Sequence, residues 1–335
     1  MKIINGLIKK NNTCHPIWFM RQAGRYLPEF QKIRSQNKDF IKLCLDSDLS
    51  SKITLQPIDR FDLDAAIIFS DILIVPYALG QKITFEKDKG PSLSNMDINK
   101  FCNVNENTFV KRLKPVYDAI EKTRKKLNKE KALISFVGAP WTLAIYMLGL
   151  KLDKNSLDIK AFNKKKADVK LVIQKLNDFL CIHIKNQIDA GADTIQIFDS
   201  WAGLLPNKYL NDFCYQPNMK LVDFCKRKKI PVICFPKGLK KNYSIFNKIV
   251  KSDGLNIDYD LDPEWAKVNL KNVCIQGGMN PNKLLLDEKK IYEEAEKYLK
   301  IFKNHPYIFN LGHGLLPSTD PDKLSKLIKF VKNYE

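Results

Sequence analysis

Two arginines four residues apart, Arg21 and Arg25, stand in the segment PIWFMRQAGRYLPEF, which covers residues 16–30. A guanidinium group presents a planar fork of donors that matches a carboxylate, so two of them on one short turn suit a ligand with several acid groups. Gly24 lies between them and leaves backbone N–H groups accessible. The alternative is that both arginines form ordinary surface ion pairs. The aromatic residues on both sides of the pair favour the anion-binding interpretation.

Asp71 is the carboxylate whose position is most unusual. It follows the apolar run Ala65–Phe69 by two residues and precedes the apolar run Ile72–Val75. A buried carboxylate is costly unless donors or cations surround it, and a carboxylate held in that way can stabilise positive charge that develops on a substrate. The alternative is that Asp71 only caps the helix that follows the strand.

Three further side chains lie next to strand ends. His313 stands between Gly312 and Gly314, where backbone freedom and little crowding would let it face a ligand. Tyr146 comes shortly after G-A-P-W-T, on a predicted short helix, and core packing is the alternative for it. Ser200 lies in D-S-W-A-G, which is not the G-x-S-x-G of hydrolases, so we expect a hydrogen-bond donor there and not a nucleophile.

The elements that must position these residues alternate between short apolar strands and amphipathic helices. This alternation is typical of βα units with a buried parallel sheet. Seven strands are predicted. The eighth is either the irregular segment around Ile17–Met20 or a run whose pattern does not distinguish a strand from a helix. Among the helices, one is predicted to end at Gly191 and another to begin after Asp320, which precedes Pro321. We therefore expect a single-domain α/β fold over residues 1–335, a (β/α)8 TIM-like barrel. The predicted strands are Ala65–Phe69, Leu133–Val137, Thr194–Phe198, Pro231–Phe235, Gly254–Ile257, Val273–Gln276 and Tyr307–Leu311.

Polar and glycine-rich sequences follow six of these strands. They are F-S-D, G-A-P-W-T, D-S-W-A-G, P-K-G, Q-G-G and G-H-G. In a barrel all of them lie at the C-terminal rim of the strands, where the βα loops build active sites. The sequence therefore predicts a polar active-site cleft at that rim.

The formal net charge of +19 raises the question of a nucleic-acid partner. The lysines are spread along the chain, the longest run is only Lys164–Lys166, and no nucleic-acid-binding motif accompanies them, so no nucleic-acid partner is predicted. A positive field around a cleft would instead raise the encounter rate with an anionic substrate.

The cysteines argue against a metal site and for a reducing compartment. No C-x-x-C spacing occurs, so no structural zinc is predicted. The sequence shows neither a secretion signal nor an apolar run that could span a bilayer, so we expect a cytoplasmic protein with no membrane association. The eight cysteines are Cys14, Cys44, Cys102, Cys181, Cys214, Cys225, Cys234 and Cys274.

Several motifs together resemble the uroporphyrinogen decarboxylase family of haem (porphyrin) biosynthesis. They are PIWFMRQAGRYLPEF, DAAIIFSDILIVPYALG, FVGAPWTLAIYMLGL, TIQIFDSWAG, ICFPKG, IQGGMNP and FNLGHGLLP. The resemblance runs from about residue 16 to the C-terminus. It implies a carboxy-lyase without cofactor, usually a homodimer, that converts the four acetate side chains of uroporphyrinogen III to methyl groups, giving coproporphyrinogen III and four CO2.

The resemblance also implies roles for individual residues. The loop from Arg21 through Gln22, Ala23 and Gly24 to Arg25 would bind substrate carboxylates. Asp71 would be catalytic, together with Arg21 and Arg25, and would hydrogen-bond the pyrrole N–H groups. Arg21 is also a candidate proton donor. The remaining substrate-binding residues would be Tyr146, Ser200 and His313.

The chain departs from the commoner family pattern at three places, which bear on the shape of the loops. Trp201 follows Ser200 where histidine is frequent, I-Q-G-G-M-N-P replaces Q-G-N-L-D-P, and G-L-K-L-D-K-N follows Tyr146.

Two rival functions remain. One is a methyltransferase of the same superfamily, which would hold zinc through an H-x-C pair that this chain lacks, and the other is a non-enzymatic binder of anions or nucleic acid.

Overall fold

The computed structural model describes residues 1–9, 15–86, 90–153 and 156–334. Cys14 lies outside this range. The strands are β1 Ala65–Ile67, β2 Ile83–Glu86, β3 Gly90–Leu93, β4 Ala132–Gly138, β5 Thr194–Asp199, β6 Val232–Pro236, β7 Gly254–Ile257, β8 Cys274–Gly277 and β9 Tyr307–Ile308. The α-helices are α1 Lys2–Lys9, α2 Pro28–Gln36, α3 Phe40–Cys44, α4 Ser47–Arg60, α5 Ile74–Ala78, α6 Ile98–Cys102, α7 Glu106–Lys126, α8 Pro140–Leu148, α9 Ile159–Lys164, α10 Lys166–Asp189, α11 Asn207–Leu210, α12 Gln216–Arg227, α13 Tyr243–Val250, α14 Pro263–Asn269, α15 Glu288–Ile301 and α16 Pro321–Lys332.

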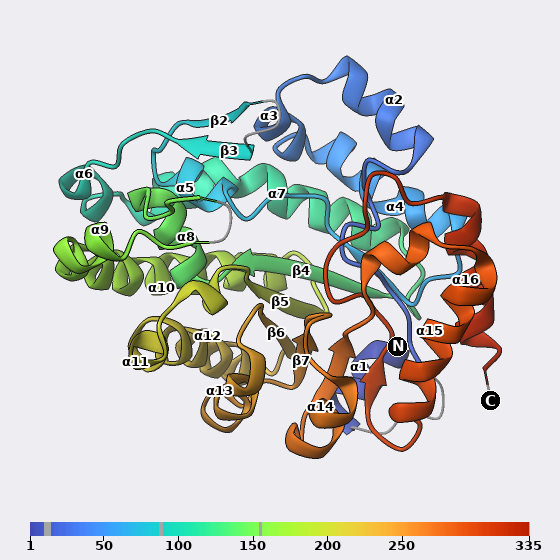
Figure 1. Ribbon diagram of the computed structural model, residues 1–335. Helices are drawn as coiled ribbons and strands as arrows, with labels where there is room; N and C mark the ends of the chain where they lie inside the picture. Colours follow the sequence, from blue (N-terminus) through green and yellow to red (C-terminus); the bar gives the residue numbers. More distant parts are fainter. Residues whose placement is uncertain (10–14, 87–89, 154–155, 335) are drawn as a thin grey trace.

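A curled parallel sheet of seven strands forms the centre of the molecule (Figure 1). The strand order is β1-β4-β5-β6-β7-β8-β9, and each neighbouring pair is parallel. All seven predicted strands are confirmed. Because the strands are parallel and the helices return the chain each time, the carboxyl ends of all seven strands meet at one rim.

The eighth position of the barrel is filled by a segment without a regular strand. Ile17 forms a single parallel bridge with Phe309, directly after β9. On its other side the carbonyl of Ile17 accepts from the Asp64 N–H at 2.9 Å, directly before β1. The predicted Ile17–Met20 segment therefore links the two edges of the sheet, and it does so through isolated contacts only.

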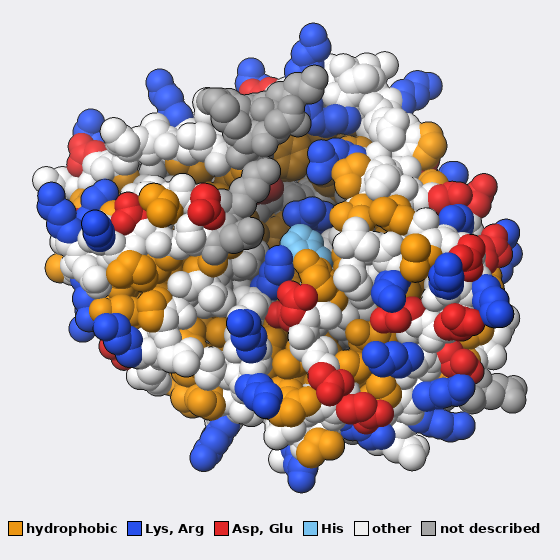
Figure 2. Space-filling model, in the orientation of Figure 1, with side chains coloured by type: hydrophobic (Ala, Val, Ile, Leu, Met, Phe, Trp, Pro, Cys, Tyr) orange, Lys and Arg blue, Asp and Glu red, His pale blue; other side chains and the backbone are white. Residues whose placement is uncertain are grey.

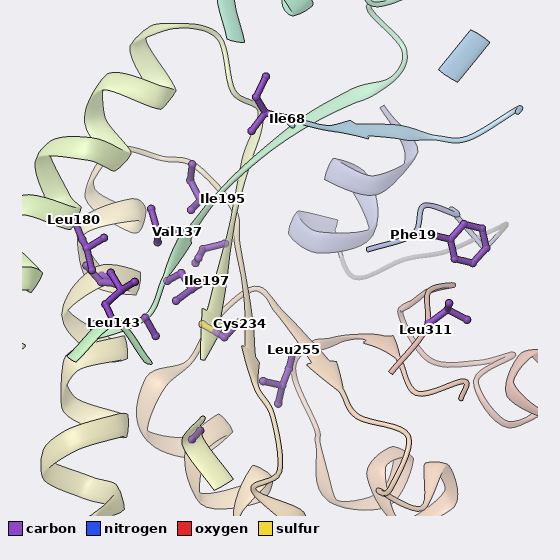
Figure 3. Close-up of a cluster of buried hydrophobic side chains, with 14 of the residues drawn as sticks. Phe19, Ile68, Val137, Leu143, Leu180, Ile195, Ile197, Cys234, Leu255 and Leu311 are labelled. Carbon is purple, nitrogen blue, oxygen red and sulfur yellow. The ribbon is translucent and has the colours of Figure 1, made fainter. Parts of the chain in front are cut away.

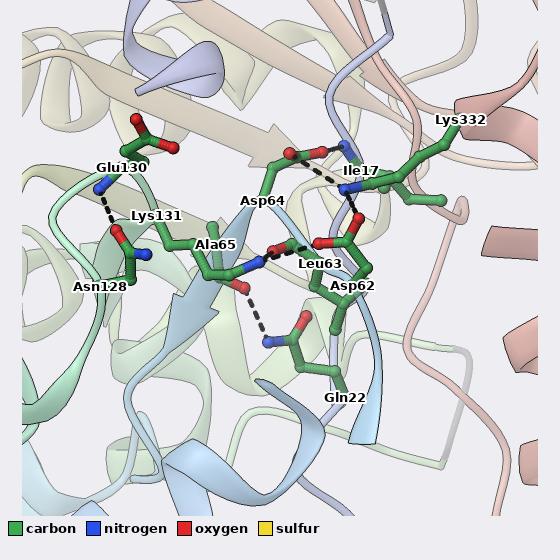
Figure 4. Close-up of polar contacts among 10 residues, drawn as sticks. All are labelled: Ile17, Gln22, Asp62, Leu63, Asp64, Ala65, Asn128, Glu130, Lys131 and Lys332. Carbon is green, nitrogen blue, oxygen red and sulfur yellow. Dashed lines mark hydrogen bonds and ion pairs between the residues drawn. The ribbon is translucent and has the colours of Figure 1, made fainter. Parts of the chain in front are cut away.

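Side-chain bonds reinforce this link (Figure 4). Asp64 Oδ2 accepts from the Ile17 N–H at 2.8 Å, and Lys332 at the end of α16 donates to Asp64 Oδ1 at 3.4 Å. Lys332 also pairs with Asp62 at 2.7 Å. The segment that leads into Arg21 is thus attached to both the start of β1 and the C-terminal helix.

Side chains on alternate positions of the strands face two different cores. Val137, Ile195 and Cys234 point outward and pack against helices such as α10, which contributes Leu180 (Figure 3). The inward positions form a second cluster that includes Ala65, Ile134, Ile233 and Ile308.

The helix α1 covers the end of the barrel opposite to the rim. Its residues Ile3 and Leu7 are fully buried and belong to the inner cluster. A Cβ atom added to Gly254, the first residue of β7, would come within 2.7 Å of Leu7 Cδ2, which shows how closely the helix approaches the strand ends. In the part of the chain that the structure describes, α1 thus closes the end of the barrel that is opposite to the predicted site residues.

Two predicted helix boundaries are confirmed, and one element was not predicted. The helix α10 ends before Gly191, which has a φ of +107°, and α16 begins after Asp320, whose side chain accepts from the Asp322 N–H. The antiparallel hairpin β2–β3 was missed. Among the described helices, none is long and apolar enough to cross a membrane.

Candidate active site

The predicted site residues lie at the rim, in a hollow of the molecular surface. Figure 2 shows lysine or arginine side chains and a histidine gathered in this hollow near the middle of the view. Arg21 follows the segment that bridges β9, Asp71 follows β1, Tyr146 lies on α8 after β4, Ser200 follows β5, and His313 follows β9. A separate surface groove of about 460 Å³ beside α15 and α16, lined by residues such as Tyr292 and Phe330, contains none of them.

Arg21 has an unusual backbone that its neighbours fix. Its φ is +62°, a left-handed conformation that is uncommon for a residue with a side chain. The preceding residue, Met20, donates its N–H to Asn310 Oδ1 at 3.2 Å and accepts from the Leu315 N–H at 2.9 Å. Surrounding structure of this kind is what holds a residue in a sparsely populated conformation. The Arg21 side chain is thereby directed along the G-H-G loop.

The side chain of Gln22 is bonded at both ends to the protein. It is fully buried, its Oε1 accepts from the Phe19 N–H at 3.0 Å, and its Nε2 donates to the carbonyl of Ala65 at 3.0 Å. Figure 4 shows the second of these bonds. Gln22 therefore attaches the arginine loop to β1 and does not face the hollow.

The loop between the arginines is a tight turn that requires glycine. A Cβ atom on Gly24 would lie 2.6 Å from the carbonyl oxygen of Arg21, and the carbonyl of Gly24 accepts from the Leu27 N–H at 3.0 Å. Ala23 and Gly24 are half-buried, whereas Arg25 is exposed. The turn thus places two guanidinium groups on the same side of the rim.

Asp71 is half-buried at the end of β1, as its apolar flanks predicted. Two side chains of α4 fix the strand end, because Ser50 donates to the carbonyl of Phe69 at 2.6 Å and Thr54 Oγ1 accepts from the Phe69 N–H at 2.8 Å. Asp71 Oδ1 accepts from the Leu73 N–H at 2.8 Å. This bond closes an Asx turn and does not cap a helix, because the N-cap residue of α5 is Leu73, which makes no side-chain cap bond. The capping alternative is therefore wrong, and one carboxylate oxygen of Asp71 remains for another partner.

The pKa of Asp71 lies much closer to neutral pH than that of an ordinary carboxyl group. Burial raises the pKa of Asp71 to about 6, although the Leu73 N–H and the nearby Arg21 favour the charged form. Arg21 and Asp71 form no direct ion pair among the described residues, so space remains between them. A carboxylate that is desolvated and still accessible is typical of a functional site.

Arg21 and Tyr146 belong to the same electrostatic group. Burial lowers the pKa of the Arg21 guanidinium, Arg25 lowers it further, and Asp71 and Tyr146 act in the opposite direction. Burial raises the pKa of the Tyr146 phenol, an effect that Trp201 opposes and Asp71 reinforces. The structure therefore brings four predicted residues, Arg21, Arg25, Asp71 and Tyr146, within electrostatic reach of one another.

His313 is a neutral side chain that lies close to the cations Arg21 and Lys237. Burial lowers its pKa to about 3, and Arg21 and Lys237 contribute. Its Nδ1 accepts from the Gly314 N–H at 2.7 Å, so the proton of the neutral ring must be on Nε2. The flanking glycines are needed for close approach and not for backbone freedom, since a Cβ on Gly312 would lie 2.8 Å from the Asp258 carbonyl carbon.

Ser200 lies in a turn that a buried aspartate organises. Thr142 Oγ1 donates to Asp199 Oδ1 at 2.7 Å and accepts from the Trp201 N–H at 3.1 Å. Asn218 donates to Asp199 Oδ2 at 2.9 Å. Ser200 itself is half-buried. The turn after β5 is thereby joined to the first turn of α8, which carries Tyr146.

Trp201, one of the departures from the family pattern, covers Tyr146. The two rings meet edge to face with centroids 6.1 Å apart, and the Lys151 Nζ lies 3.6 Å from the centroid of the Trp201 ring. An indole under an ammonium group is a favourable cation–π arrangement. The tryptophan therefore closes one side of the hollow beside Tyr146.

The sequence interpretation missed Lys237, Asp199 and Thr142. Lys237 is half-buried at the end of β6. It lies near enough to His313 to lower the pKa of that side chain, and near enough to Arg21 for its own pKa to be lowered by the guanidinium group. Its position directly after an apolar strand was the available signal. Asp199 and Thr142 lie within the motifs D-S-W-A-G and G-A-P-W-T, but nothing in the spacing shows that they bond to each other.

The C-x-H spacing at Cys181 and His183 does not form a metal site, because His183 is buried and its Nδ1 is hydrogen-bonded to the Tyr117 hydroxyl at 3.0 Å. Across the described residues, no group of three or more His, Cys, Asp or Glu side chains could hold a metal ion.

The fold and the site define an α/β-barrel protein whose rim combines arginines, a desolvated carboxylate and a neutral histidine. The family model described as uroporphyrinogen decarboxylase (URO-D) matches residues 2–334. A protein named uroporphyrinogen decarboxylase from Orientia tsutsugamushi (strain Ikeda) is 42% identical, and the match covers 99% of this chain and 98% of the relative. One of the same name from Rickettsia bellii is 39% identical over 100% of this chain and 99% of the relative. The chain belongs to the uroporphyrinogen decarboxylase family.

Solved structures agree with the fold. A methyltransferase from Methanosarcina mazei superposes with a TM-score of 0.82 at 16% identity, covering 99% of this chain and 98% of that one. A B12-independent methionine synthase from Shewanella sp. W3-18-1 gives a TM-score of 0.52 at 12% identity, covering 90% and 89% of the two chains. At such identities the likeness concerns the barrel alone.

Proposed function

We propose that this protein removes CO2 from the four acetate side chains of uroporphyrinogen III and releases coproporphyrinogen III, a step of haem biosynthesis. Family membership over nearly the whole chain supports the activity. The single structural observation that carries the mechanism is Asp71, a half-buried carboxylate whose pKa is raised to about 6 and which lies within electrostatic reach of Arg21.

Decarboxylation requires a group that accepts the electron pair of the broken C–C bond. Breaking the bond between an acetate methylene and its carboxylate leaves an electron pair, which a pyrrole can accept only after the ring has taken up a proton. The pair then flows into the cationic ring as CO2 leaves. A second proton converts the exocyclic methylene to a methyl group while the ring releases the first one. The net change is one proton taken up for each CO2 released.

Asp71 is the group that lowers the barrier. An anion placed at the centre of the macrocycle accepts hydrogen bonds from pyrrole N–H groups and stabilises the cationic ring. The free carboxylate oxygen of Asp71 is available for this, because the other oxygen is already bonded to the Leu73 N–H. Since the substrate itself accepts the electrons, we propose that no cofactor takes part.

Arg21 and Arg25 hold the substrate carboxylates in this scheme, and Arg21 is the candidate proton donor. Its lowered pKa moves a normally inert guanidinium toward acid behaviour. The backbone of Ala23 and Gly24, the phenol of Tyr146, the hydroxyl of Ser200 and the Nε2–H of His313 supply further hydrogen bonds to the substrate. Gln22 acts through the loop that it holds.

The decisive experiment is an anaerobic assay with reduced uroporphyrinogen III. We expect porphyrinogens with seven, six, five and finally four carboxylates to accumulate, measured after oxidation by chromatography. An unchanged octacarboxylate, under conditions in which a known decarboxylase is active, would contradict the proposal. Metal analysis of the purified protein is the companion measurement, since tightly held stoichiometric zinc would favour the methyltransferase alternative.

We further propose that the whole chain acts as one domain, that it works in the cytoplasm, and that it forms a homodimer. The homodimer is the usual assembly implied by the resemblance to the family. Sedimentation of the purified protein at several concentrations tests the dimer, and a mass equal to one chain at micromolar concentration would contradict it.

A further inference from the structure

Lys237 is a half-buried cation at the rim whose backbone is fixed on both sides. Its N–H donates to the carbonyl of Asp199 at 3.1 Å, and its own carbonyl accepts from the Gly203 N–H at 2.9 Å. The next residue, Gly238, has a φ of +83° and packs directly against Gly203. The side chain of Lys237 therefore starts from a rigid point between the strand ends of β5 and β7.

The nearest carboxylates do not neutralise this lysine. Asp258 is buried, and its oxygens already accept from the Gly238 N–H at 2.7 Å, the Tyr243 hydroxyl at 3.0 Å and the Asp260 N–H at 3.2 Å. Asp260 is exposed. In the described part of the chain, Lys237 makes no ion pair with either of them.

The other charged and titratable groups around Lys237 favour the binding of an anion there. Burial lowers the pKa of its ammonium group, Asp258 and Asp260 oppose this effect, and Arg21 lowers the pKa further. On the same side stands the neutral His313, with its proton on Nε2. A half-buried cation next to a second cation, without an ion-pair partner, is strongly favoured to bind an anion.

We propose that Lys237 binds a side-chain carboxylate of the macrocyclic substrate and that the Nε2–H of His313 donates to the same carboxylate. This subsite lies after β6 and β9, whereas the arginine loop lies beside β1. Carboxylates project all around the rim of the macrocycle, so cations on separate strand ends can each bind a different one while Asp71 faces the centre. The inference rests on the proposed function for the identity of the ligand.

The first test measures binding of uroporphyrin III, the oxidised octacarboxylate, by quenching of protein fluorescence. Lys237→Met is expected to weaken binding about tenfold or more, since a hydrogen bond to a charged group is lost, and Lys237→Arg is expected to restore most of it. The salt dependence of binding should become shallower in Lys237→Met. In turnover, KM should rise more than kcat falls. The matched control is Lys241→Met, an exposed lysine in the 3-10 turn Lys240–Asn242 after the same strand.

The inference is overturned if Lys237→Met binds uroporphyrin III as the unchanged protein does, or if Lys241→Met weakens binding equally, because the effect would then come from net charge alone. Failure of the proposed function gives a different result. If the protein binds uroporphyrin III through Lys237 but does not decarboxylate uroporphyrinogen III, the subsite is supported and the proposed function is contradicted.

A second measurement uses the unchanged protein, so that it does not depend on the folding of a variant. An amine-specific reagent, trinitrobenzenesulfonate at pH 8, is applied with and without saturating uroporphyrin III, and modified peptides are quantified by mass spectrometry. We expect Lys237 to be modified in the free protein and protected in the complex, whereas Lys241 reacts equally in both. Unchanged reactivity of Lys237 in the complex would refute the subsite.

Discussion

The side chain of Arg21 occupies the space that Gly314 leaves open. A methyl group at position 314 would lie 2.6 Å from Arg21 Cγ. The left-handed backbone of Arg21 and the missing side chain of Gly314 are therefore two parts of one arrangement, although 293 positions separate them (314 − 21). The guanidinium group can reach the region of Asp71 only while position 314 has no Cβ.

Gly314→Ala should displace Arg21 while leaving the fold intact, because the clashing atoms belong to a flexible side chain. We expect kcat/KM to fall on the order of 100-fold, the usual effect of a misplacement of about 1 Å in an active site. The thermal midpoint should change little. Ser318→Ala, an exposed position of the same loop, is the control and should keep full activity.

Asp71→Ala should abolish turnover, with a loss of at least ~100-fold, because no anion remains to stabilise the cationic ring. Circular dichroism should show an unchanged fold. Asp97→Ala is the control, since Asp97 is also an aspartate that accepts a backbone N–H, from Lys100 at 3.1 Å, but its side chain is exposed on the turn before α6. Near-normal turnover by Asp71→Ala would refute the electrostatic role.

The pH profile should show an acidic limb near pH 6, the raised pKa of Asp71. Below this pH the carboxylate takes up a proton and kcat/KM should fall about tenfold per unit. His313, with a pKa of about 3, should add no limb between pH 5 and 8. A flat profile from pH 5 to 7 would contradict the assignment.

The same shift predicts how stability depends on pH. The pKa of Asp71 is higher in the folded protein than in the unfolded chain, so the folded state binds the proton more tightly and stability falls as pH rises from about 4 to about 6. Asp71→Asn should therefore be more stable than the unchanged protein at pH 7, by at most about 2–3 kcal/mol, and equally stable near pH 4. Denaturant unfolding at both pH values measures this, and a destabilised variant at pH 7 would contradict it.

Tyr146→Phe and Ser200→Ala should only weaken the reaction. Each removes one neutral hydrogen bond to the substrate, which corresponds to a roughly 2- to 10-fold loss in kcat/KM. Thr142→Val should lower the free energy of unfolding by ~1–3 kcal/mol, more than either of these variants. The buried Asp199 loses one of its hydrogen-bond donors, and the Trp201 N–H loses its acceptor. Thr108→Val, an exposed position on α7, is the control.

The sequence predicted the fold well because the signals are local. Apolar strands followed by glycine or polar residues gave all seven strands of the sheet, and Gly191 and Asp320 marked the helix ends that the structure has. The hairpin β2–β3 was missed because neither of its strands contains a continuous apolar run, which was the signal used for the strands of the buried parallel sheet.

The sequence predicted which positions form the site, but it did not predict the contacts between their side chains. The sequence placed Asp71 and His313 at strand ends, but it could not show that Gln22 turns inward to Ala65 or that Lys237 stands near His313. Both depend on pairings between residues far apart in the chain. The roles of Gly312 and Gly314 were attributed to backbone freedom, whereas the structure shows that both make room for a neighbouring chain segment.

The helix α1 has a consequence for the movement of small molecules. Ile3 and Leu7 close the far end of the barrel, so among the described residues the hollow at the rim is the open end. In the proposed reaction, the protons taken up and the CO2 released therefore pass through the same opening as the macrocycle. Shortening α1 would expose the inner cluster, which includes Ala65 at the start of β1, to water from the opposite end of the barrel.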